Sequence, residues 1–170
     1  MNLDQDLIDK INKKAKEIED KIIQYRRELH KNPELGLAEN ETSKFIKKEL
    51  KDIGIPIEEN LYGRKEIKEE LDKLGEKIQD EHKSTGLVGF LEGAQNGKTV
   101  LLRSDMDALK VKETKNEEHL PAKKDFRSRN EGIMHACGHD SHMAMLLGAA
   151  HILSEHKEQI KGKIKFLFQP

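Results

Sequence analysis

The spacing of apolar residues changes once along the chain, and this change limits the folds that the sequence can adopt. Up to about residue 82 apolar side chains recur at steps of three and four, which predicts amphipathic helices. After that point short apolar runs appear, and such runs are typical of strands. These runs are residues 86–91, 99–102 and 163–168. Helices, strands, a helix and a last strand, in that order, predict an α/β fold with a sheet covered by helices.

The individual elements can be placed by their end signals. Four helices are predicted, at residues 3–29, 40–52, 65–82 and 140–155. The first should end near Asn32-Pro33, because a residue before proline avoids the helical region. Asn96-Gly97 separates the first two apolar runs and is a strong hairpin signal, so these runs are expected to pair as a hairpin. The polar segment 110–132 is expected to be an irregular loop.

Composition excludes several classes of protein. The net charge is −1, with 31 basic and 32 acidic residues, which argues against a generally basic nucleic-acid-binding protein. One cysteine excludes an intramolecular disulfide framework. No apolar run approaches the ~18 residues of a membrane span, and the N-terminus does not resemble a secretory signal. We therefore expect a cytoplasmic protein without nucleic-acid or membrane partners.

Residues 135–142 are the densest group of metal-binding side chains, with three histidines, the single cysteine and an aspartate. Thiolate and imidazole are natural ligands of Zn²⁺ and similar metals. Gly138 allows the backbone to turn, so Cys137 and His139 can point at one place. Because there is no second cysteine pair, the pattern predicts an open catalytic site rather than a zinc finger. The alternative is a cysteine that packs as a small apolar group beside histidines that cap the next helix.

Two carboxylates follow the strand predicted at 99–104. If the extended conformation continues, Asp105 and Asp107 lie on the same side of the chain, where they could bind a metal or orient a metal-binding histidine. The alternative is a solvated turn. His30 stands near a helix end, and there a dipole partner is favoured over a catalyst.

The motifs that carry a family resemblance occur in a fixed order. They are Arg26-Arg27 with His30-Lys31-Asn32-Pro33-Glu34-Leu35-Gly36, then Leu102-Arg103-Ser104-Asp105-Met106-Asp107-Ala108-Leu109, Met134-His135-Ala136-Cys137-Gly138-His139-Asp140, and Phe166-Leu167-Phe168-Gln169-Pro170. In this order they closely resemble the N-terminal part of the M20 family of metallopeptidases and amidohydrolases. The nearest branch contains N-acyl-amino-acid amidohydrolases, hippurate hydrolases, thermostable carboxypeptidases and auxin-conjugate hydrolases.

The resemblance implies an α/β, zinc-peptidase-like catalytic domain with a mixed sheet flanked by helices. Residues 1–170 would be a single incomplete catalytic domain with a helical insertion at about 62–83. Cys137 and His139 would be ligands of a centre of two divalent metal ions, which could be Zn²⁺, Mn²⁺ or Co²⁺. Asp107 would be the catalytic-site carboxylate that orients a ligand, whereas a direct role for Asp105 is less certain. The implied reaction is hydrolysis of an amide bond in a small N-acyl amino acid or peptide substrate, by a metal-bound water whose proton a glutamate accepts.

The sequence also departs from the family pattern. Family members continue after Phe-Gln-Pro with Ala-Glu-Glu, which supplies the general base and another ligand, whereas this sequence stops at Pro170. We therefore expect a half-site, inactive or nearly so alone, that works only with a complementary C-terminal chain or does not work at all. The last strand is expected to be an unprotected edge. Two alternatives remain: a non-enzymatic metal-binding or protein-interaction remnant, and a helical regulatory partner.

Overall fold

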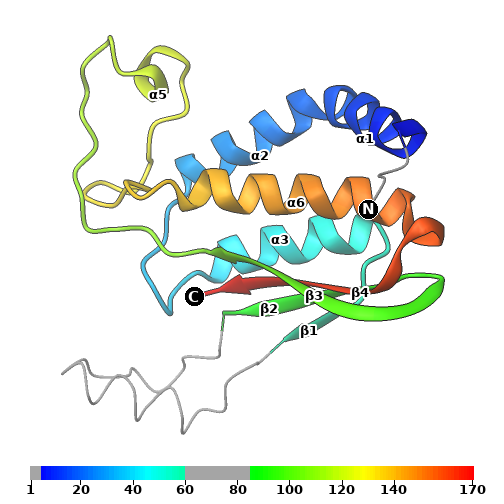
Figure 1. Ribbon diagram of the computed structural model, residues 1–170. Helices are drawn as coiled ribbons and strands as arrows, with labels where there is room; N and C mark the ends of the chain where they lie inside the picture. Colours follow the sequence, from blue (N-terminus) through cyan, green and yellow to red (C-terminus); the bar gives the residue numbers. More distant parts are fainter. Residues whose placement is uncertain (1–4, 60–84) are drawn as a thin grey trace, which may run out of the picture.

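The computed structural model describes residues 5–59 and 85–170, which form a layer of helices packed on one face of a sheet (Figure 1). The helices are α1 (Gln5–Glu17), α2 (Glu19–Lys31), α3 (Asn40–Asp52), α5 (Leu120–Lys123) and α6 (His139–Glu155), with a short 3-10 turn at Lys157–Gln159. The strands are β1 (Ile57–Glu59), β2 (Leu87–Glu92), β3 (Gln95–Asp105) and β4 (Lys161–Gln169). The expected α/β class is confirmed. The helix predicted at 65–82 and the insertion at 62–83 lie outside the described residues.

The described sheet is mixed, as expected, but its order corrects two predictions. The order is β1-β2-β4-β3, with β2 antiparallel to β4 and β3 parallel to β4. The expected hairpin between residues 86–91 and 99–102 is therefore wrong, since β4 lies between these two strands. The last strand is also not an edge, because β4 has neighbours on both sides and β3 takes the edge position.

Close backbone packing explains why the hairpin signal misled. A side chain at Gly97 would come within 2.6 Å of the backbone carbon of Lys161, and one at Gly162 within 2.0 Å of the carbonyl oxygen of Lys98. Gly162 also has a φ of +99°, which residues with a Cβ rarely adopt. The glycine after Asn96 therefore lets β3 approach β4 where their pairing shifts register.

The first predicted helix is divided into two. α1 and α2 meet at Ile18, whose φ of −101° and ψ of 6° interrupt the helix. The apolar residues of α1 are partly buried and continue the spacing of those of α2, so this spacing does not reveal the bend. α2 ends at Lys31, as the following Asn32-Pro33 predicts. The predictions for α3, α6 and the largely irregular loop over 110–132 are confirmed, apart from the short α5.

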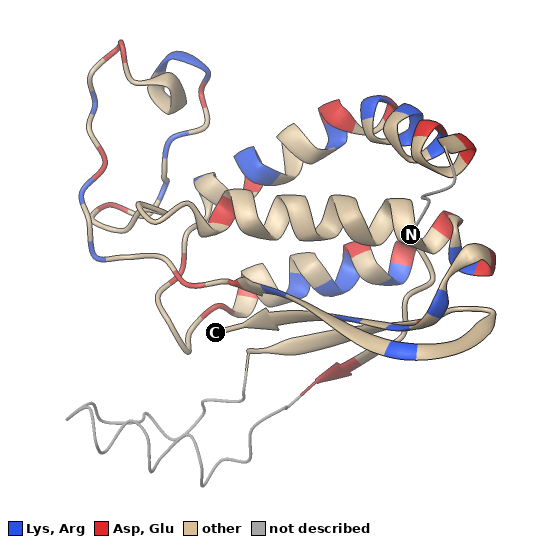
Figure 2. Cartoon of the chain, viewed as in Figure 1, with Lys and Arg blue, Asp and Glu red and all other residues tan. Residues whose placement is uncertain are grey.

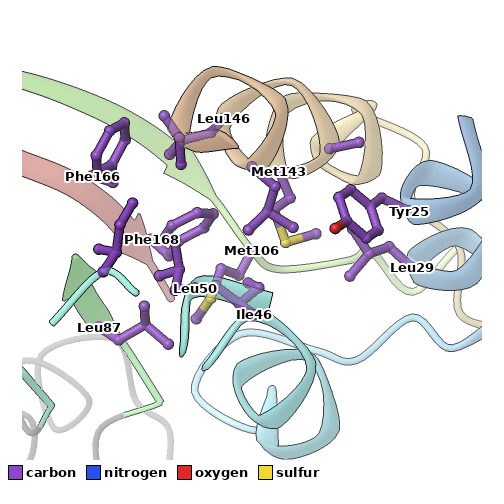
Figure 3. Close-up of a cluster of buried hydrophobic side chains, with 14 of the residues drawn as sticks. Tyr25, Leu29, Ile46, Leu50, Leu87, Met106, Met143, Leu146, Phe166 and Phe168 are labelled. Carbon is purple, nitrogen blue, oxygen red and sulfur yellow. The ribbon is translucent and has the colours of Figure 1, made fainter. Parts of the chain in front are cut away.

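The core lies between the helices and the sheet (Figure 3). α6 packs between α2 and α3, and Figure 2 shows that it carries few charges along its length, whereas its neighbours carry many. Its Gly148 accommodates Ile22 of α2, because a Cβ at this position would come within 2.6 Å of the Ile22 side chain. Phe166 and Phe168 of β4 are fully buried beneath this layer. None of the described helices is both long and apolar enough to cross a membrane.

Candidate metal centre

The candidate site lies where three elements meet. β3 ends at Asp105, its parallel neighbour β4 ends at Gln169, and α6 begins at His139. The amide of Met106 donates a hydrogen bond of 2.8 Å to the carbonyl oxygen of Gln169, which joins the two strand ends. Gly138 precedes α6 with a φ of +83°, so a glycine is suited to the turn that presents the neighbouring side chains. Ligands of α/β folds commonly bind at such carboxyl ends of strands.

The imidazole of His139 contacts both aspartates that the sequence singled out. Its Nδ1 lies 2.9 Å from the backbone oxygen of Asp107 and 2.9 Å from Oδ1 of the same residue. Its Nε2 lies 3.9 Å from Oδ2 of Asp105, which also pairs with Arg103. Because Nδ1 faces two acceptors, it carries the ring proton and donates it to Asp107. In the neutral ring this arrangement leaves the lone pair on Nε2, which is the form of histidine that binds metals.

Cys137 stands just before α6 as an exposed free thiol. A thiol, an imidazole nitrogen and carboxylates suit Zn²⁺, Mn²⁺ or Co²⁺. Across residues 5–59 and 85–170, however, no group of three or more His, Cys, Asp or Glu side chains could hold a metal ion together. These residues therefore fit the expected metals as a partial set of donors.

A buried polar network beside the site was not predicted from the sequence. His30, which is 2% exposed, donates from Nδ1 to Asp140 over 2.8 Å and from Nε2 to Glu113 over 3.0 Å. Arg26 donates to the same Asp140 oxygen over 3.1 Å. The expected role of His30 as a helix-dipole partner is thus incomplete, because its ring joins two carboxylates. A glutamate inside a polar loop gives no local signal that would have identified Glu113.

His135 is a second buried histidine, and in the described residues neither of its ring nitrogens has a hydrogen-bond partner. Burial lowers the pKa of His135 from 6.5 to about 4; the nearby Asp140 carboxylate opposes this effect, and the positive charge of His30 adds to it. As the pH falls, the unfolded chain therefore binds a proton at this histidine at a higher pH than the folded chain does. Stability due to neutral His135 is complete above pH 6.5 and is lost as the pH falls toward 4.

We accordingly expect acidification from pH 7 to pH 5 to cost the metal-free chain about 2 kcal/mol through His135. The His135→Leu variant lacks this proton and should lose correspondingly less stability over the same interval. Urea unfolding at the two pH values measures the difference, with the exposed His142→Leu as the matched control. Equal losses in the wild type and in His135→Leu would contradict the assignment.

Comparisons with known proteins agree with the geometry. Residues 101–170 match the sequence model of peptidase family M20/M25/M40. Thermostable carboxypeptidase 2 of Saccharolobus solfataricus is 43% identical over 165 residues, covering 97% of this chain. The N-acetyl-L-cysteine deacetylase of Bacillus subtilis is 40% identical over 153 residues, covering 90% of the chain. The chain is similar to members of peptidase family M20. It spans 35% and 30% of the lengths of these two relatives.

Solved structures of M20 relatives have the same fold. A putative aminohydrolase from methicillin-resistant Staphylococcus aureus aligns with a TM-score of 0.75 and 31% identity, covering 95% of this chain and 34% of that one. A protein from Bacillus subtilis, described as a dinuclear metal binding peptidase from the M20 family, aligns with a TM-score of 0.70 and 32% identity. That alignment covers 91% of this chain and 36% of that one.

Proposed function

We propose that this chain provides part of a dinuclear metal centre that hydrolyses amide bonds in N-acyl amino acids or short peptides. The observation that carries the proposal is the His139 imidazole, held through Nδ1 by Asp107 so that Nε2 is free to bind a metal. The relatives support the substrate class, since they include a carboxypeptidase, an N-acetyl-L-cysteine deacetylase and an N-acyl-L-amino acid amidohydrolase. All three relatives are named as hydrolases, so they give no support to a metal-binding or interaction remnant or to a helical regulatory partner.

Each residue has a distinct role in this proposal. Cys137 and His139 would bind Zn²⁺, Mn²⁺ or Co²⁺, and the bound metal would supply an acidified water for attack on the amide carbonyl. Asp107 accepts the Nδ1 proton of His139, which keeps the ring in its metal-binding form and fixes its direction. A cytoplasmic location belongs to the same proposal, because a reducing compartment keeps the exposed Cys137 thiol available.

The number of donors also bears on activity. A dinuclear centre needs more ligands than one thiolate, one imidazole and the nearby carboxylates, and the described residues form no group of three that could hold a metal. We therefore propose that residues 1–170 act as an incomplete catalytic domain with low activity alone. A complementary chain that supplies the remaining ligands and the general base should raise that activity.

An assay of N-acetyl-amino-acid hydrolysis tests the proposal. The chain is loaded with Mn²⁺, Co²⁺ or Zn²⁺ and assayed with and without the C-terminal segment of an M20 relative. Metal-dependent hydrolysis in the combined sample is expected, and Asp107→Asn should reduce it about 10–100-fold because the His139 ring loses its charged acceptor. The exposed Asp52→Asn is the matched control and should leave the rate unchanged.

Two results would count against the proposal. The first is the absence of hydrolysis from the combined sample with each of the three metals. The second is an Asp107→Asn rate equal to that of Asp52→Asn, which would remove the assigned role of the aspartate.

A further inference from the structure

The first turn of α6, which carries His139, is not fixed by a capping side chain. Its N-cap residue is Gly138, so no side-chain oxygen accepts from the amides at the start of the helix. Contacts to other segments hold this turn instead. His139 donates to Asp107, and Asp140, which is 1% exposed, accepts from His30 of α2 over 2.8 Å.

The His30 ring is held on both sides. Its Nδ1 faces Asp140 and its Nε2 faces Glu113 over 3.0 Å. Glu113 is itself fixed, because it accepts from His119 over 2.8 Å and from the backbone amide of Ser128 over 2.6 Å. Rotation of the His30 ring would break both of its hydrogen bonds, so the contact to Asp140 has a defined direction.

The charges of this network strengthen the contact. Burial alone would lower the pKa of His30, but hydrogen bonds to Asp140 and Glu113 outweigh this effect and raise it. A cationic imidazole between two carboxylates makes shorter and stronger hydrogen bonds than a neutral one.

We propose that His30 is a positioning residue for the metal centre, which holds the first turn of α6 through Asp140 and thereby aims the His139 imidazole. This inference rests on the proposed function, because it concerns the same centre. His30 is not a catalytic residue, since it is buried behind α6 and contacts neither Cys137 nor His139 in any hydrogen bond of the described structure.

Two substitutions separate the two sides of the ring. In His30→Asn the amide nitrogen takes about the position of Nδ1, so donation to Asp140 is kept and donation to Glu113 is lost. In His30→Gln the amide nitrogen takes about the position of Nε2, so the contact to Glu113 is kept and the contact to Asp140 is lost. The proposal requires His30→Gln to disturb the metal centre more than His30→Asn.

The measurement is titration of the chain with Co²⁺, followed by the thiolate-to-cobalt absorption band, which reports ligation by Cys137 without any need for activity. His30→Gln is expected to weaken Co²⁺ binding about 10-fold or more, whereas His30→Asn should stay within about threefold of the wild type. His151→Gln is the control for a general loss of stability. His151 is likewise a buried histidine, but it lies on α6 and forms a hydrogen bond of 3.0 Å with the Tyr25 hydroxyl, in a separate network. Its substitution should lower the melting temperature and leave Co²⁺ affinity unchanged.

The outcomes are distinct. Equal Co²⁺ affinity in His30→Gln and the wild type, or equal losses in His30→Gln and His151→Gln, would overturn the positioning role. If His30→Gln does not fold, Asp140→Asn replaces it with the same expected loss, and a folded Asp140→Asn with wild-type affinity would overturn the role. Cys137→Ser is titrated in parallel. If this variant keeps the absorption band, the proposed metal centre itself is wrong. If Cys137→Ser loses the band but His30→Gln binds Co²⁺ like the wild type, only the inference about His30 is rejected.

Discussion

Replacing Cys137 with serine is expected to lower Zn²⁺ or Co²⁺ affinity on the order of 100-fold or more. Residues behind a ligand already contribute about 10–100-fold to metal affinity, so loss of a ligand should cost at least as much. A serine hydroxyl is a poor replacement, because it is not ionised at neutral pH and softer metals prefer sulfur. Competition with a coloured chelator measures the affinity.

The stability of the chain should barely change in this variant, since Cys137 is exposed and substitutions of exposed residues usually alter the free energy of unfolding by less than about 0.5 kcal/mol. The chain has one cysteine, so bound metal should also protect the wild type from a thiol reagent at a stoichiometry of one. Ser141→Ala, in the first turn of α6 close behind Cys137, is the matched control. Unchanged metal affinity in Cys137→Ser, or a thiol that reacts equally fast with and without metal, would reject Cys137 as a ligand.

The largest loss of stability is expected from Phe168→Ala, at about 3–5 kcal/mol. Phe168 is 0% exposed and lies opposite Leu87 in the pairing of β4 with β2. Aromatic residues are only 4% of the chain, so few other large side chains can fill the cavity. Urea unfolding monitored by circular dichroism measures the difference.

Leu101→Ala is the control for this prediction. Leu101 lies on the neighbouring strand β3 but is 53% exposed, so its truncation should change the free energy of unfolding by less than about 0.5 kcal/mol. Equal losses in the two variants would mean that the layer between α6 and the sheet is not the main source of stability.

Local signals predicted the helices well and the sheet poorly. The ends of α2 and α3 follow from Asn32-Pro33 and Gly54, because these residues act on the backbone beside them. The sheet order depends instead on β4, which is far along the chain and lies between β2 and β3. No local signal at Asn96-Gly97 distinguishes a hairpin turn from a close approach of two strands.

The same contrast applies to the site. Cys137 and His139 are predicted as ligands because they stand two positions apart in one motif. The His30 network was missed because its partners are distant in sequence, Glu113 by 83 positions and Asp140 by 110. Only the packing of α2 against α6 brings them together, so the sequence could predict the candidate ligands but not the buried residues that hold them.

The central position of β4 has a consequence for synthesis on the ribosome. β2 and β3 are translated before β4, and in the described sheet they are not neighbours: β2 pairs with β1 and β4, whereas β3 pairs with β4 alone. The apolar side chains of β3 therefore leave the exit tunnel before its partner strand in the described sheet exists, and those of β2 meet only the short strand β1. The nascent chain should be most susceptible to misfolding and most dependent on chaperones during this interval, which ends when β4 emerges and joins them.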